Sequence, residues 1–134
     1  KVLLKPGGPA TFAHLGGLPW LALPGNPVSS TVTFLLLARA WLDAALGRAP
    51  QGPFEQSIPA IATAPLASAG RKTTLLRVRL AAHGDSIEAV PTGNQNSGVV
   101  RSLADADALA IVPPDTAYEP GAAIRVLPLA SLLG

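Results

Sequence analysis

Apolar residues in the first third of the chain follow two patterns in succession, a short continuous run and then a helical repeat. Leu18 to Leu23 is apolar without alternation, which is typical of a strand covered on both faces. From Val28 to Leu46, apolar residues recur at helical spacing. Asn26 is a favourable N-cap, Pro27 suits the first helical position, and Gly47 suits the C-terminal end. The pattern predicts a strand, a tight turn and a helix, the arrangement of an α/β unit.

Short strand-like segments separated by turn residues make up most of the remaining chain. Lys1 to Leu4 and Thr11 to Leu15 precede the α/β unit. Downstream, five more segments bounded by Gly, Pro, Asp or Asn predict a small barrel or sandwich. These five are Pro59 to Leu66, Thr73 to Ala82, Ser86 to Pro91, Leu109 to Val112 and Ala122 to Leu127.

The second half of the chain also predicts where charged side chains lie. In the strand that begins at Thr73, one face is apolar and the other carries Arg77 and Arg79. Ser102 to Ala108 is predicted as a short capped helix, with Asp105 as the acid of its first turn. Gly and Pro gather at positions 47–53, which predicts a domain boundary between residues 1–49 and residues 50–134.

Composition and charge mainly argue against certain partners and sites. The 134 residues carry a net charge of +2, too small a basic excess for a nucleic-acid or anionic-membrane partner. The most apolar window spans only Val28 to Ala38, short of the roughly 20 residues that cross a bilayer. With no cysteine and 2 His, a metal cage is not expected. We expect a soluble protein and, because the first residue is Lys1 rather than Met, a piece of a longer one.

Three loops and one strand hold the candidate chemistry. Pro24 to Ser29 joins a strand end to a helix N-terminus, where free N–H groups, the helix dipole and a hydroxyl favour an oxyanion. Lys5 to Pro9 offers a lysine, and Pro91 to Gly98 is dense in hydrogen-bonding side chains. Arg77 or Arg79 could grip an oxyanion through a planar guanidinium. Taken singly, a helix cap, a solvated lysine, a polar turn and a solvated sheet face explain the same residues.

Taken together and in order, these segments resemble the molybdopterin molybdenumtransferase family, which includes the bacterial MoeA proteins and the gephyrin E domain. The resemblance covers essentially the whole chain. It implies that residues 1–49 are the C-terminal part of an α/β molybdopterin-binding domain and that residues 50–134 are a small β-barrel C-terminal domain. The strings that carry it are Lys5-Pro6-Gly7-x-Pro9-x-Thr11-Phe12-Ala13, Leu23-Pro24-Gly25-Asn26-Pro27-Val28-Ser29 and Thr92-Gly93-Asn94-Gln95-x-Ser97.

The resemblance implies a role in molybdenum cofactor biosynthesis. Members of the family insert molybdenum from molybdate into the dithiolene of adenylylated molybdopterin, with Mg²⁺ assisting and AMP released. It also implies a cytoplasmic, homodimeric parent protein with no nucleic-acid or membrane partner. The acidic residues that bind Mg²⁺ are expected upstream, so we expect no metal site in this chain and no catalysis by this chain alone. The sequence does not distinguish molybdate from tungstate.

Carried to matching positions, the resemblance implies an oxyanion pocket. Lys5 and its loop would hold molybdate or the terminal phosphate, Ser29 and the helix N-terminus would complete the pocket, and Arg77 and Ser97 would face molybdate from the barrel, with Arg79 as the alternative arginine. Many members carry a second lysine where this chain has Gly8. A non-catalytic scaffold and a degenerate structural fragment remain the alternative functions. The predicted binding residues are Lys5, Pro6, Gly7, Pro9, Pro24, Gly25, Asn26, Pro27, Ser29, Arg77 and Ser97.

Overall fold

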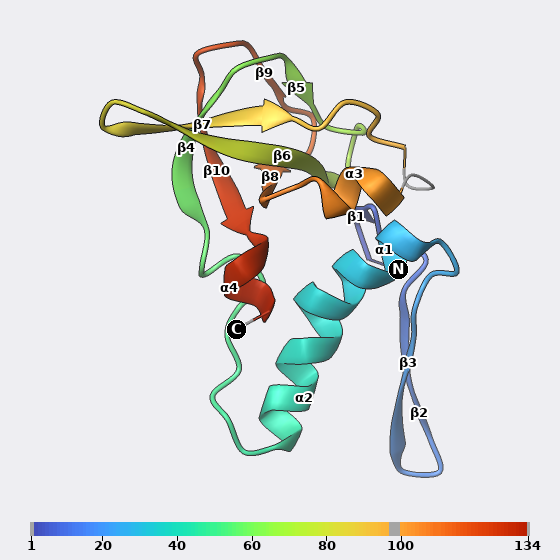
Figure 1. The fold of residues 1–134 in the computed structure, drawn as a ribbon. Coiled ribbons are helices and arrows are strands. Elements are labelled where there is room, and N and C mark those ends of the chain that lie inside the picture. The colour runs from blue at the N-terminus through green and yellow to red at the C-terminus, as the bar shows by residue number, and fades with distance from the viewer. Residues whose placement is uncertain (1, 97–99, 134) are drawn as a thin grey trace.

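A closed barrel of five strands forms one end of the molecule (Figure 1). The computed structural model describes residues 2–96 and 100–133. Around the ring, β6 neighbours β7, which neighbours β4, then β10, then β8, which returns to β6; only the β4–β7 contact is parallel. The barrel confirms the five predicted strands. Their bounds are β4 (Ile58–Ala62), β6 (Thr73–His83), β7 (Ser86–Pro91), β8 (Ala108–Val112) and β10 (Ala123–Pro128).

Small side chains fill the barrel interior. Five alanines pack there with Val78, Val112, Val126 and Leu66. Small residues suit a narrow barrel, because its interior has room for few large side chains. One boundary prediction was wrong: β4 ends at Ala62, and β5 (Leu66–Ala67) is a separate strand that pairs with β9 (Ala117–Tyr118).

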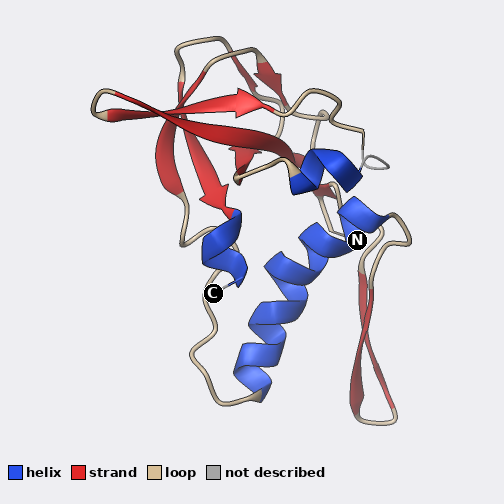
Figure 2. Cartoon of the chain, viewed as in Figure 1, coloured by secondary structure: helices blue, strands red, loops and turns tan. Residues whose placement is uncertain are grey.

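A continuous helical run starts beside the barrel and extends away from it (Figure 2). It comprises α1 (Pro27–Thr33), the π-helical η1 (Phe34–Ala38) and α2 (Arg39–Ala45). Its start is as predicted, since the Asn26 side chain accepts the Ser29 N–H and Pro27 occupies the first position. Its apolar face contributes to a second core of eight buried residues: Leu4, Val28, Val32, Leu36, Leu75, Leu109, Leu127 and Leu132.

The helical run is longer than the apolar window seen in the sequence, because Arg39 does not end it. Arg39 pairs with Asp43, and the helix continues to Ala45. By length and composition alone the run Pro27–Ala45 could cross a membrane, and 33% of its apolar window is buried inside the protein. Burial of Val28, Val32 and Leu36 is what a core helix requires. The absence of a membrane partner stays a prediction.

β2 (Thr11–Leu15) and β3 (Leu18–Ala22) form an antiparallel hairpin that extends away from the barrel (Figure 1). The expectation that Leu18 to Leu23 is covered on both faces is wrong within the described chain, because Leu18 and Trp20 are 68% and 56% exposed. An apolar run indicates that its side chains are favoured to be buried, but it does not show that the residues that bury them belong to the same chain. The assignment of this part to an α/β domain therefore stays a prediction.

Two short helices and one short strand differ from the sequence analysis. α3 is Val100–Ala104 rather than Ser102 to Ala108. Asp105 therefore follows the helix in a turn, and the next acid, Asp107, accepts the Leu80 N–H of β6 at 2.9 Å, which ties the connection to β6. α4 (Leu129–Leu133) was not predicted. The first strand is β1 (Leu4–Lys5), and it pairs in parallel with the start of β6.

Candidate functional site

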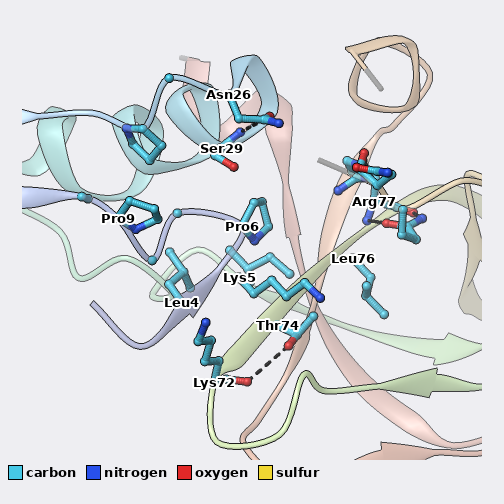
Figure 3. A pocket seen from close by; sticks show the side chains of 18 of the residues that line it. Leu4, Lys5, Pro6, Pro9, Asn26, Ser29, Lys72, Thr74, Leu76 and Arg77 are labelled. Atoms are coloured by element: carbon cyan, nitrogen blue, oxygen red, sulfur yellow. Dashed lines mark hydrogen bonds between the residues drawn. The ribbon is translucent and has the colours of Figure 1, made fainter. Parts of the chain in front are cut away.

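A cleft of about 1300 Å³ lies where three segments distant in the sequence meet. One wall is the loop after β1, a second is the start of α1, and the third is β6 with the loop at residues 94–96. In Figure 3, Lys5 and Lys72 lie on one side of this space, Asn26 and Ser29 on the opposite side, and Arg77 further along β6. The cleft is therefore assembled by tertiary packing rather than by one local motif.

The first loop is held by strand pairing and by close packing on α1. Lys5 is in register with Thr74 of β6. Gly7 has φ +121°, a conformation that side chains rarely allow, and a Cβ there would lie 2.5 Å from the Thr33 Oγ1. The Gly7 carbonyl accepts the Ala10 N–H at 3.0 Å. Glycine at this position lets the loop approach the helix closely.

The start of α1 presents a hydroxyl to the cleft. Ser29 is only 7% exposed, yet its hydroxyl has no hydrogen-bond partner in the described part of the chain. Figure 3 shows this oxygen directed toward the loop that holds Pro6. The Ser29 N–H is weakly held by the Asn26 Oδ1 at 3.5 Å. Ser29 is thus a nearly buried donor that a ligand in the cleft could use.

Arg77 is buried, in contrast to the solvated sheet face that alternation predicted. Its side chain is 1% exposed, because the loop at residues 92–96 and α3 cover this end of β6. The Nε donates to the Ser102 Oγ at 2.9 Å, and an Nη donates to the carbonyls of Asn94 at 3.4 Å and Asn96 at 3.2 Å. The guanidinium therefore organises the loop while it lines the cleft.

The charge of Arg77 is not neutralised within the described residues. None of the ion pairs there includes Arg77. Burial lowers the pKa of its guanidinium, since the charged form loses solvation. An unpaired buried cation is costly, and an anion beside it would offset that cost. Arg79, the alternative arginine, is exposed, donates to the Asp105 carbonyl and does not line the cleft.

Most of the predicted site residues come together in this cleft. Pro27 does not line it, and Ser97 lies outside the described residues. Sequence reasoning missed Lys72, whose position no motif signals, and left Gln95 unassigned although it lies in a quoted motif. The predicted residues that line the cleft are Lys5, Pro6, Gly7, Pro9, Pro24, Gly25, Asn26, Ser29 and Arg77, and further lining residues are Gly8, Lys72, Thr74, Asn94, Gln95 and Asn96.

The described residues of the cleft do not fit Mg²⁺. This ion takes oxygen ligands that usually include carboxylates, whereas the described lining contains three cations and no Asp or Glu. Nor do the described residues contain a group of three or more His, Asp or Glu side chains that could hold a metal. The electrostatics of the cleft favour an anion instead.

Comparison with known proteins agrees with the fold. Residues 59–129 match the family model described as MoeA C-terminal region (domain IV). The chain is 33% identical to molybdopterin molybdenumtransferase 2 of Mycobacterium tuberculosis over 115 residues, 86% of this chain and 27% of that protein. It is 30% identical to molybdopterin molybdenumtransferase of Bacillus subtilis over 128 residues, 95% of this chain and 29% of that protein.

A solved structure places the same architecture in a larger protein. The molybdopterin biosynthesis moeA protein from Pyrococcus horikoshii aligns with a TM-score of 0.69 at 21% identity, over 94% of this chain and 30% of that one. This chain thus spans less than a third of the length of these relatives. The family model covers more than half of the chain, from β4 to the start of α4. The chain therefore belongs to the MoeA family, and it matches the C-terminal region of that family.

Proposed function

We propose that this chain is the oxyanion-binding part of a molybdopterin molybdenumtransferase that acts in molybdenum cofactor biosynthesis. In this proposal the cleft holds molybdate while the parent protein inserts molybdenum into adenylylated molybdopterin and releases AMP. Residues 1–49 belong to the molybdopterin-binding domain and residues 50–134 to the C-terminal barrel domain. The parent protein is a cytoplasmic homodimer, and the Mg²⁺ ligands come from its upstream part.

One observation carries the proposal: the cleft places three cationic side chains around a shared space whose described lining contains no carboxylate. Lys5 ends β1, whereas Lys72 and Arg77 both belong to the β6 segment, Lys72 just before its first residue and Arg77 within it. Like charges repel, so such a grouping has a cost unless an anion occupies it. Molybdate is a tetrahedral dianion, and charged forks, ammonium groups and fixed hydroxyls are the donors such an anion requires.

Each wall has a different part in holding the anion. Lys5 is exposed and flexible, so it supplies charge without fixing orientation. Ser29 supplies a hydroxyl from a rigid helix start, and Arg77 supplies a buried charge held in place by Ser102 and two carbonyls. Groups fixed before the ligand arrives stabilise developing charge without reorganising, which favours transfer chemistry on an oxyanion.

Calorimetric titration of the chain with molybdate tests the proposal, with sulfate as a tetrahedral dianion of different size. We expect saturable binding that is tighter for molybdate than for sulfate. Equal binding of both anions would make the cleft a general anion site. Absence of binding to either, by a chain with the far-ultraviolet spectrum of a folded protein, would contradict the proposal.

A further inference from the structure

We infer that Lys72 is the second ammonium of the oxyanion site and that it acts at the first loop, beside Gly8; this inference rests on the proposed function. Lys72 precedes β6 and is half-buried. Figure 3 shows its side chain extending toward Leu4 and the loop of Pro6 and Pro9. A Cβ built at Gly8 would lie 3.9 Å from the Lys72 Nζ. The ammonium thus occupies the space that a side chain at position 8 would enter.

Hydrogen bonds hold the backbone of Lys72 and of the residues next to it. The Thr74 hydroxyl donates to the Lys72 carbonyl at 3.2 Å and accepts the Ala69 N–H at 2.8 Å. The next residue, Thr73, donates its N–H to the Leu3 carbonyl at 3.1 Å. These bonds tie the start of β6 to the strand that leads into the first loop, so the stem of Lys72 and the loop keep their relative positions.

Among the described residues, the ammonium of Lys72 has no protein partner. None of the hydrogen bonds and ion pairs of the described residues uses its Nζ, and the described lining of the cleft holds no acid. A lysine needed only for solubility would extend away from other cations, whereas this one lines the cleft that also contains Lys5 and Arg77. Two ammonium groups and a guanidinium that already holds two carbonyls suit a doubly charged tetrahedral oxyanion.

Substitution of Lys72 separates this inference from the proposed function. In titrations of the chain with molybdate, Lys72→Met and Lys72→Gln should each weaken binding by about tenfold, the scale of one charged hydrogen bond. Arg71→Met is the matched control, because Arg71 is the adjacent residue, carries the same charge, is exposed and does not line the cleft. It should change the affinity by less than about twofold, because exposed charges outside the site are screened.

A lysine introduced at position 8 tests whether the ammonium of Lys72 acts beside the first loop. Gly8 has no positive φ, so a side chain is allowed there once the Leu4 carbonyl, 3.3 Å from a Cβ, gives slightly. Gly8→Lys in the Lys72→Met background should recover most of the lost affinity, and Lys72→Arg should keep most of it. Thermal unfolding of each variant verifies that the fold is kept.

The outcomes distinguish the two claims. If the unsubstituted chain does not bind molybdate, the proposed function fails and the inference fails with it. If the unsubstituted chain binds but Lys72→Met, Lys72→Gln and Arg71→Met all bind equally well, the inference alone is overturned. Repeating the titrations with inorganic phosphate distinguishes a molybdate contact from a phosphate contact. A loss for phosphate but not for molybdate would overturn the assignment of Lys72 to molybdate.

Discussion

The side-chain amide of Gln95 pairs with both backbone groups of Arg77, as a neighbouring strand would. Its Oε1 accepts the Arg77 N–H at 2.8 Å, and its Nε2 donates to the Arg77 carbonyl at 2.9 Å. On the opposite edge of β6, Arg77 is paired with Leu109 of β8. One glutamine therefore extends the sheet by a single residue and joins the cleft loop to the strand that carries its buried cation.

Loss of this amide should loosen the loop and destabilise the barrel. We expect Gln95→Ala to lower the free energy of unfolding by about 2 kcal/mol, since two hydrogen bonds are lost and an N–H is left partly buried without a partner. Urea denaturation measures this value. Gln56→Ala is the control, because Gln56 is exposed and bonds only to the Gln51 side chain. Equal stability of the two variants would contradict a structural role for Gln95.

The charge and the shape of Arg77 make separate contributions. Arg77→Lys keeps the charge but loses the planar fork that reaches Ser102 and the two carbonyls, and it should cost about 3 kcal/mol of stability. Arg79→Lys, the matched control on the same strand, should cost less than about 0.5 kcal/mol, because that side chain is exposed. Urea unfolding of both proteins gives the comparison. A loss at Arg79 as large as at Arg77 would contradict the difference in burial.

The sequence indicated the local features of this site well. Asn26 and Pro27 carry short-range helix-start signals, and the structure has the helix begin there. Five strands with turn residues between them were enough to predict a small β domain, because a barrel or a sandwich is how short strands bury one face. Each of these features depends on residues within a few positions of one another.

Features that depend on long-range packing could not be predicted. Alternation placed Arg77 on a polar face, since no sequence pattern shows that the loop at 94–96 and α3 cover it. Lys72 reaches the cleft only because β1 pairs with β6 across more than sixty residues. The exposed hairpin of β2 and β3 is the reverse case, in which an apolar run is not covered by the described chain.

Ser29 should affect binding without affecting stability. Its hydroxyl has no partner in the described part of the chain, so Ser29→Ala should change the free energy of unfolding by less than about 0.5 kcal/mol. Molybdate affinity should fall about fivefold, the scale of one neutral hydrogen bond. Ser30→Ala on the next position is the control, because that hydroxyl donates to the Pro27 carbonyl and does not line the cleft. An unchanged molybdate affinity in Ser29→Ala would remove this residue from the site.

Removing the hydroxyl of the buried residue Thr33 should make the protein more stable. It is 0% exposed, and its Oγ1 is a buried polar atom without a hydrogen-bond partner among the described residues. Thr33→Val keeps the shape and removes the unsatisfied hydroxyl, so it should raise the free energy of unfolding by about 1 kcal/mol. Thermal or urea unfolding measures the change. A loss of stability would mean that the hydroxyl is satisfied in solution.

Substitutions at Thr33 also allow the packing of the first loop against α1 to be measured. Gly7→Ala should cost about 2 kcal/mol, because the new methyl group meets the Thr33 Oγ1 and the φ of +121° is strained for any side chain. Combining it with Thr33→Ala removes the collision but not the strained backbone, so about half of the cost should be recovered in a double-mutant cycle. Combining it with Thr33→Val should recover none, because a methyl group replaces the hydroxyl at the same place. Additivity in both cycles would show that the loop does not rest on the helix, and the wall formed by Lys5 would then not be held against α1.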